Sequence, residues 1–354
     1  MPTIGQAWFL ETPGKPLVQK EIRLADPGPS DVVVEVLACG LCHTDLTYAS
    51  GATGTKHALP LVLGHEVVGK VVAAGDGVAH ALGKSVIVPA VMGCGECAFC
   101  KSGRANACLA QKMPGNDIDG GFATHLAVPG AALIDVSQAP PSVDRRDLSV
   151  VADAVSTAQQ AIYRSGLGEG DVAFVVGSGG VGAFVAQIAR AKGAHVIAFD
   201  VEDKRLALIK EFGAELAISV KDREVKELRK EAGKAAGRYG LPSFRYRIFE
   251  CSGTTNGQLL AFALISHGAT MVQVGYTPKP VEVRLSNLMA FDATVHGSWG
   301  APPQAYADVL PLVYQGKVAI APFTAHAPMS RINELLDDMA AHKLDKRMVL
   351  DPRA

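Results

Sequence analysis

A glycine-rich turn in the middle of the chain restricts the possible folds more than any other sequence feature. The turn directly follows the apolar run 171–176 (DVAFVV) and opens a helical pattern over 181–192. A second apolar run, 195–200 (HVIAFD), comes next. Continuous apolar strands that alternate with helices predict a doubly wound parallel sheet, because helices then cover both faces of the strands. The turn itself matches G-x-G-x-x-G and reads Gly177-Ser178-Gly179-Gly180-Val181-Gly182.

The position of this turn, between a strand and a helix, also predicts a dinucleotide site. Its glycines let the backbone approach a pyrophosphate at the N-terminus of the helix. Asp200, which ends the second strand, can accept hydrogen bonds from the adenosine ribose and would repel a 2′-phosphate, so NAD is favoured over NADP. Lys204 and Arg205 at the start of the next helix argue the other way. The predicted cofactor-binding residues are Gly177, Gly179, Gly180, Val181, Gly182 and Asp200.

The chain of 354 residues is long enough for two domains, and its first 150 residues differ in pattern from the middle of the chain. Short β-branched runs punctuated by glycine and proline, at 31–37, 67–74 and 85–90, predict an irregular all-β unit with functional loops. The region after residue 298 returns to mixed helix and loop. Further strands of the parallel sheet are predicted at 246–250, 269–275 and 294–297.

Composition and charge exclude several classes of function. The sequence is 48% hydrophobic and 19% charged, with a formal net charge of −1 and no run of like charges, so a nucleic-acid arm or a membrane-surface helix is not expected. Acidic and basic residues alternate over Lys221–Arg238, which is typical of a solvated helix face. Met1–Leu10 lacks the basic and apolar segments of a signal peptide, and no apolar run approaches the roughly 20 residues of a membrane span. These features predict a cytoplasmic protein.

A cluster of thiols predicts a structural metal site. The chain contains seven cysteines, and four of them have the spacing C-x2-C-x2-C-x7-C within fifteen residues. Two-residue gaps allow neighbouring thiolates to bind one ion, and four sulfurs around a tetrahedral zinc leave no position open for chemistry. An iron–sulfur cluster and unliganded core cysteines remain as alternatives. The predicted zinc ligands are Cys94, Cys97, Cys100 and Cys108.

A second set of residues has the composition of a catalytic zinc site. Cys42-His43-Thr44-Asp45 and Gly64-His65-Glu66 each place a metal-binding side chain at the end of an apolar segment, with a carboxylate next to it. A catalytic zinc takes three protein ligands and leaves a fourth position for water or substrate. On the residues alone, packed core side chains are an equally good interpretation. Cys39 forms a further C-x2-C pair with Cys42 and is a competing ligand.

The sequence resembles the medium-chain, zinc-dependent alcohol dehydrogenase family over essentially its whole length. The string Gly64-His65-Glu66-x2-Gly69-x5-Gly75-x-Gly77-Val78 resembles the zinc signature of that family, and the other motifs follow in the family's order. The resemblance implies an α/β protein of two domains. A GroES-like β-rich catalytic domain is expected over 1–153 with 298–354, and a Rossmann cofactor domain over 154–297.

The resemblance also implies roles for individual residues. Cys42 and His65 would bind the catalytic zinc, and Asp153, shortly before Ser156-Thr157, stands where many members have a cysteine ligand. Whether Asp153 binds directly or through water is left open, and Cys39 is expected in the core. The zinc would act as a Lewis acid on the substrate alcohol while hydride passes to the nicotinamide. The resemblance further implies that Glu66 can approach the metal, that Asp45 orients His65 and that Thr44 accepts the substrate proton. His43 and Arg347 would lie near the cofactor phosphates. Thr47 stands where some members have a histidine that ends the proton relay.

Three stretches, at 113–123, 150–157 and 274–293, resemble a subgroup that acts in anaerobic benzoyl-CoA degradation. These dehydrogenases oxidise the cyclic allylic alcohol of 6-hydroxycyclohex-1-ene-1-carbonyl-CoA to the 6-oxo thioester. Asn116, Asp117 and Trp299 are predicted to line the substrate pocket, although the Asn-Asp pair could simply form a turn.

Three other functions stay open. They are another secondary-alcohol or polyol dehydrogenase, a hydratase that adds zinc-activated water to a conjugated dienoyl-CoA, and a non-enzymatic protein on a dehydrogenase scaffold. A homotetramer is expected, with a dimer as the alternative.

Overall fold

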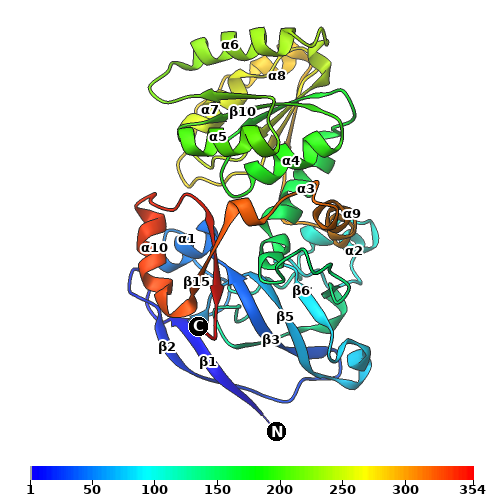
Figure 1. The fold of residues 1–354 in the computed structure, drawn as a ribbon, viewed down its shortest axis with the longest axis vertical. Helices are drawn as coiled ribbons and strands as arrows, with labels where there is room; N and C mark the ends of the chain where they lie inside the picture. The colour runs from blue at the N-terminus through cyan, green and yellow to red at the C-terminus, as the bar shows by residue number, and fades with distance from the viewer. Residues whose placement is uncertain (1) are drawn as a thin grey trace. The chain divides into compact units, whose positions relative to one another are not determined.

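The computed structural model describes residues 2–354, which form two compact units (Figure 1). The first comprises the chain up to Ser156 together with Gly300–Leu310 and Ile320–Ala354. The second comprises Thr157–Trp299 and Pro311–Ala319.

The short segment Pro311–Ala319 differs from the expected division, which assigned it to the first domain. Two hydrogen bonds explain its place in the second unit: the Ala319 amide donates to Gln187 Oε1 at 2.7 Å, and Gln187 Nε2 donates to the Ala319 carbonyl at 3.2 Å.

The first unit is built on two β-sheets. Its long strand β3 (Asp31–Gly40) is antiparallel to β5 (Glu66–Ala74), and Val32, Val33 and Val34 are fully buried. In the larger sheet the order is β15 (Thr324–Pro328), β16 (Arg347–Asp351), β3, β5, β6 (Ser85–Val88) and β8 (Ile134–Asp135), with β7 (His125–Pro129) also paired to β3. In the smaller sheet the order is β2 (Val18–Leu24), β1 (Thr3–Leu10) and β4 (Leu61–Val62).

The register between β3 and β5 brings two distant segments of the chain together. Gly40 pairs with Glu66, so the chain leaving β3 and the chain entering β5 are neighbours. A side chain at position 40 would not fit, because a Cβ there would lie 2.1 Å from Glu66 Oε2. The segments on either side of this pair therefore meet at one edge of the sheet.

The second unit is the predicted doubly wound parallel sheet. Alternate residues of β9 (Val172–Val176) face opposite sides, and Val172 and Phe174 share a core with Leu228 and Leu260 from two helices. Ala173 and Val175 are also fully buried, so both faces are covered. All pairs are parallel, in the order β11 (Leu216–Ser219), β10 (His195–Asp200), β9, β12 (Tyr246–Glu250), β13 (Thr270–Gln273) and β14 (Thr294–Gly297).

Helices complete both units (Figure 1). In the first unit they are α1 (His43–Ser50), α2 (Ala98–Lys101) and α10 (Ile332–Ala340). In the second they are α4 (Gly182–Ala191), α5 (Asp203–Phe212), α6 (Val225–Gly237), α7 (Thr255–Ala263) and α8 (Ser286–Phe291), whereas α3 (Ala154–Ser165) and α9 (Pro303–Tyr314) cross the unit boundaries. None of the helices within residues 2–354 combines the length and apolar character of a membrane span.

Candidate functional site

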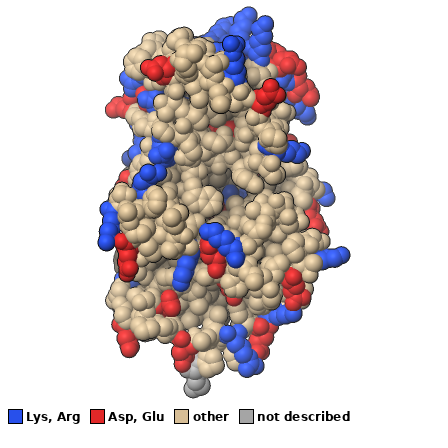
Figure 2. Space-filling view, turned by 180° about the vertical axis from the view of Figure 1, so that it is seen from behind, with Lys and Arg blue, Asp and Glu red and all other residues tan. Residues whose placement is uncertain are grey.

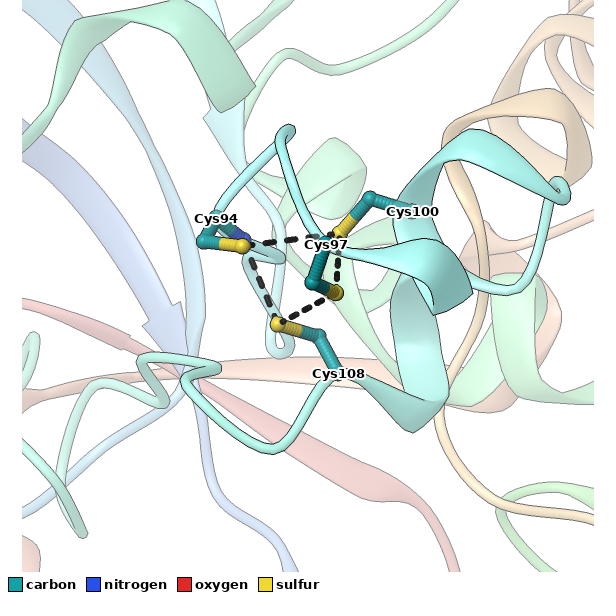
Figure 3. A group of neighbouring side chains, drawn as sticks. All are labelled: Cys94, Cys97, Cys100 and Cys108. Carbon is teal, nitrogen blue, oxygen red and sulfur yellow. Dashed lines mark hydrogen bonds between the residues drawn. The ribbon is translucent and has the colours of Figure 1, made fainter.

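The four clustered cysteines converge on one point (Figure 3). Cys97 precedes the first residue of α2, and Cys100 lies within that helix. The sulfur of Cys100 lies 3.9 Å from that of Cys94 and 3.6 Å from that of Cys97, and the sulfurs of Cys97 and Cys108 are 3.7 Å apart. Zinc–sulfur bonds of about 2.3 Å in a tetrahedron require sulfur separations of about 3.8 Å. The cluster therefore fits a four-thiolate zinc ion.

Hydrogen bonds from backbone amides stabilise a thiolate in this cluster, and a thiolate is the form that binds a metal cation. Hydrogen bonds from the backbone of Glu96 and Cys97 lower the pKa of the Cys94 thiol to about 6. Desolvation raises the pKa of Cys100 to about 11, although the Gly95 amide donates to its sulfur at 3.3 Å. The Cys94 thiol therefore loses its proton more readily than the Cys100 thiol, from which metal binding has to displace one.

A second group of metal-binding side chains forms beside the β3–β5 junction. Among the described residues, ligand atoms of Cys42, His65, Glu66 and Asp153 all lie within 4.8 Å of one another. Asp153 Oδ2 is 3.8 Å from Cys42 Sγ and 3.5 Å from His65 Nε2. Ligands that bind one tetrahedral zinc directly through sulfur, nitrogen and oxygen are about 3.4–3.6 Å apart. The observed distances are close to these values, so the group fits a shared ion, and ligation by Asp153, directly or through water, stays a prediction.

His65 shows that this group is arranged for a metal. Its Nε2 is buried and, within residues 2–354, has no hydrogen-bond partner, although it points at Cys42 and Asp153. Its other ring nitrogen, Nδ1, lies 3.2 Å from Asp45 Oδ1 and can donate to that carboxylate, which leaves Nε2 for a metal. Asp45 also accepts hydrogen bonds from the amides of Cys42 and Gly64 at 2.9 and 3.1 Å. One buried carboxylate thus orients both segments that carry ligands.

Glu66 is paired with Arg347, a contact between residues 281 positions apart. Arg347 Nη1 donates to Glu66 Oε1 at 2.6 Å, and both side chains are buried. Burial raises the pKa of Glu66 to about 7, against the lowering effect of Arg347. The other oxygen, Oε2, has no hydrogen-bond partner in the described part of the chain. Sequence analysis missed this pair, and the expected contact of Arg347 with a cofactor phosphate stays a prediction.

Replacing Arg347 with methionine is expected to destabilise the first unit by about 3–5 kcal/mol, because Glu66 would be left as an uncompensated buried carboxylate. Urea unfolding of the metal-loaded protein measures the effect. The double variant Glu66→Gln/Arg347→Met removes both charges and should unfold at a higher urea concentration than Arg347→Met alone. An unchanged midpoint for the single variant would contradict this account of the pair.

The remaining residues predicted around this group occupy different environments. Thr44 Oγ1 lies 3.8 Å from Cys42 Sγ, and the Thr47 hydroxyl donates to the Thr44 carbonyl at 2.8 Å. His43, at the start of α1, is exposed. Cys39 is fully buried and outside the metal-binding group, and burial raises the pKa of its thiol well above its usual range. Cys39 is therefore a protonated core residue.

The glycine turn in the second unit has the shape that its motif predicts. Gly177 has φ +90°, and a Cβ on Gly182 would lie 1.8 Å from the Gly177 carbonyl oxygen. A Cβ added to Gly179 would have Arg205 Nη1, at 3.6 Å, as its nearest neighbour. The backbone at Gly179 is therefore open, with a guanidinium beside it. Asp200 is buried and accepts a hydrogen bond from the Ser178 amide at 2.6 Å. These features suit a phosphate-bearing cofactor.

Glu250 is a further buried carboxylate that sequence analysis missed. It ends β12, and its Oε1 accepts hydrogen bonds from the Ser252 and Gly253 amides at 2.8 and 3.1 Å. Gln273 Nε2 donates to its Oε2 at 2.7 Å. Ser252 in turn packs on the glycine turn, because a Cβ on Gly177 would lie 2.6 Å from Ser252 Cα. Glu250 thus holds the loop at Ser252 and Gly253, which packs against the glycine turn.

The proposed substrate residues have structural contacts of their own. The side chain of Asn116 is buried and accepts a hydrogen bond from the Lys56 amide at 3.0 Å. Asp117 accepts one from the Met113 amide at 3.0 Å and lies 3.1 Å from Lys56 Nζ. These bonds tie two loops together and support the interpretation of the Asn-Asp pair as a turn. Trp299 is 52% exposed, and the substrate role of all three stays a prediction.

Comparisons with known proteins agree with this geometry. Residues 28–138 match the family described as alcohol dehydrogenase GroES-like domain, and 180–315 match that described as zinc-binding dehydrogenase. An alcohol dehydrogenase of Geobacillus stearothermophilus is 30% identical over 339 residues, covering 95% of this chain and 96% of the relative.

Two solved structures have the same fold. A short chain alcohol dehydrogenase from E. coli CFT073, complexed with NADH, is 23% identical with a TM-score of 0.84 and covers 99% of each chain. A structure from Sinorhizobium meliloti 1021, bound to NADP, is 24% identical with a TM-score of 0.84 and covers 99% of this chain and 100% of that one. Both cofactors therefore occur on this fold.

Proposed function

Because the chain belongs to the zinc-dependent alcohol dehydrogenase family, we propose that it oxidises a secondary alcohol with NAD. We further propose that the substrate is the cyclic allylic alcohol of 6-hydroxycyclohex-1-ene-1-carbonyl-CoA. The observation that carries the alcohol chemistry is the convergence of Cys42, His65 and Asp153, in which the buried His65 Nε2 has no hydrogen-bond partner among the described residues. The substrate is supported by the sequence resemblance of 113–123, 150–157 and 274–293 to dehydrogenases that act on this thioester.

In this proposal the chain's own residues bind and orient the reactants. Cys42, His65 and Asp153 would hold the zinc, which supplies Lewis-acid polarisation of an alcohol oxygen when bound. Asp45 keeps His65 in the tautomer that leaves Nε2 free for the metal. The Thr44 hydroxyl, 3.8 Å from the Cys42 sulfur, would accept the alcohol proton.

The second unit would hold the cofactor. The open backbone at Gly179 would cradle the pyrophosphate, and Asp200 would accept the ribose hydroxyls through lone pairs that remain beside its bonds to the Ser178 and Glu202 amides. NAD supplies the hydride acceptor when bound.

The charge on the face shown in Figure 2 is compatible with an anionic thioester. On the face shown in Figure 2, basic and acidic side chains are interspersed, so a phosphate group would depend on a few local lysines or arginines rather than on a broad basic field.

Following NADH formation with the cyclic hydroxy-enoyl-CoA, ethanol, sorbitol and other secondary alcohols tests the proposal. The thioester is expected to have the highest kcat/KM of the panel. Comparable rates on ethanol or sorbitol would overturn the substrate and leave the alcohol chemistry standing. Incubation with the conjugated dienoyl-CoA in the absence of NAD, followed by product analysis, distinguishes the hydratase, since only a hydratase would form the alcohol.

Asp200→Asn is expected to shift cofactor preference. Asparagine keeps an oxygen for one of the two amides that Asp200 binds, those of Ser178 and Glu202, and it removes the charge that repels a 2′-phosphate. We expect kcat/KM with NADP to rise by about tenfold, which corresponds to about 1.4 kcal/mol, and the value with NAD to fall. Steady-state kinetics with both cofactors give the ratio. Asp203→Asn, at the start of α5, is the matched control and should leave that ratio unchanged.

A further inference from the structure

The segment that leads to Asp153 is buried along its whole length. It forms a 3-10 helix, η4 (Asp147–Ala152), in which every residue is buried. Asp153 follows with φ −133° and ψ −68°, which is neither helical nor extended, and α3 begins at the next residue. No regular hydrogen-bond ladder therefore sets the conformation of Asp153. Its position depends on what holds the peptides on either side of it.

The end of η4 is held by a buried tyrosine from a distant part of the chain. The hydroxyl of Tyr306, a residue of α9, donates to the Ala152 carbonyl at 2.7 Å, and Tyr306 is only 1% exposed. The Ala90 amide donates to the same carbonyl at 3.1 Å. The Ser156 hydroxyl lies 3.3 Å from the Ala152 carbonyl and 3.1 Å from the Asp153 carbonyl, and it can donate to either. Two of the donors around the peptide group that joins Ala152 to Asp153, Tyr306 and Ala90, thus come from distant parts of the chain.

The start of η4 is held in the same way. Asp147 is buried, and its Oδ1 accepts a hydrogen bond from the Thr324 hydroxyl at 2.9 Å. His326 Nε2 lies 2.7 Å from the same oxygen. Thr324 and His326 both belong to β15, so one strand of the larger sheet fixes the first residue of η4.

We propose that Tyr306, with Thr324 and His326, positions Asp153 as the third ligand of the catalytic metal. The inference rests on the proposed metal site of Cys42, His65 and Asp153. An aspartate has a short side chain with two rotatable bonds, so a displaced backbone cannot be corrected by the side chain. Catalytic geometry tolerates errors of only about 0.5 Å. The Tyr306 hydroxyl acts on the peptide next to the ligand, which makes it the most direct of the three contacts.

The test is Tyr306→Phe, which keeps the ring and removes the hydroxyl. Protein loaded with Co²⁺ at both metal sites is titrated with a chelator while visible absorption is recorded. Release from the four-cysteine site is the internal reference, and the Cys42→Ser variant identifies the signal of the other site. We expect Tyr306→Phe to lose the ion of the Cys42–His65–Asp153 site at about 10- to 100-fold lower chelator concentration and with an altered absorption band. The four-cysteine signal should not change.

Tyr246→Phe, which removes a hydroxyl from β12 in the second unit, is the matched control and should behave as the wild type. Thr324→Val is the second variant and should weaken the same ion, since it removes one bond to Asp147. An unchanged spectrum and affinity in both Tyr306→Phe and Thr324→Val would overturn the inference. A wild-type protein that binds only one ion would instead overturn the proposed metal site. The two failures are therefore distinguishable.

Discussion

Asp153→Ala is expected to release one of two metal ions and to lower kcat/KM by at least about a thousandfold, which corresponds to about 4 kcal/mol of transition-state stabilisation. The carboxylate stands 3.8 Å from Cys42 Sγ and 3.5 Å from His65 Nε2, at the spacing of a shared ion. With Asp153 absent, only a thiolate and an imidazole would remain beside Glu66, which is already paired with Arg347. Metal content per chain and steady-state kinetics measure the two effects.

Asp153→Cys is the control for this experiment, because a cysteine thiolate is a zinc ligand of similar reach. It should retain the second ion and bind Co²⁺ with an additional sulfur-to-metal absorption. If Asp153→Ala keeps two ions per chain and its activity, Asp153 is not a ligand. Retention of the ion with loss of activity would instead indicate that Asp153 acts beside the metal.

Cys108→Ala is expected to remove the ion of the four-cysteine cluster and to unfold the loop that carries it. Structural zinc sites of this kind contribute about 10 kcal/mol or more to the folding of their segment at neutral pH. Cys108 is 3% exposed and lies 3.7 Å from the Cys97 sulfur, so its loss also opens a hole beside the remaining thiols. The lower metal content should be accompanied by protease cleavage between residues 93 and 112.

Cys251→Ala provides the comparison, since Cys251 lies in the second unit and outside both groups of metal-binding residues among those described. It should keep two ions per chain and resist the protease. A Cys108→Ala protein with full metal content and an intact loop would show that the cluster holds no structural ion. The pair of variants thus separates the loss of a ligand from the loss of any cysteine.

The local sequence patterns predicted much of the fold and one complete site. The runs 171–176, 195–200 and 246–250 lie on the strands β9, β10 and β12, because an uninterrupted apolar run fits a strand covered on both faces. The Cys94–Cys108 spacing brings its thiols together within one loop. Such features depend on neighbours in the chain, so the sequence shows them directly.

The Cys42–His65–Asp153 group could be predicted only through family resemblance. Its members come from the end of β3, the start of β5 and the peptide after η4, and they meet because Gly40 pairs with Glu66 in the sheet. Strand register and the position of η4 are set by packing across the whole unit. The spacing of residues along the sequence does not reveal that packing.

The sequence by itself determined the parallel sheet, the glycine turn and the four-cysteine cluster, since each depends on residues close together in the chain. Only the tertiary structure decided that Arg347 lies on Glu66, that Tyr306 holds the peptide before Asp153, and that Pro311–Ala319 joins the second unit. Buried charges and buried carbonyls must find partners wherever the fold supplies them, and those partners here lie more than a hundred residues away.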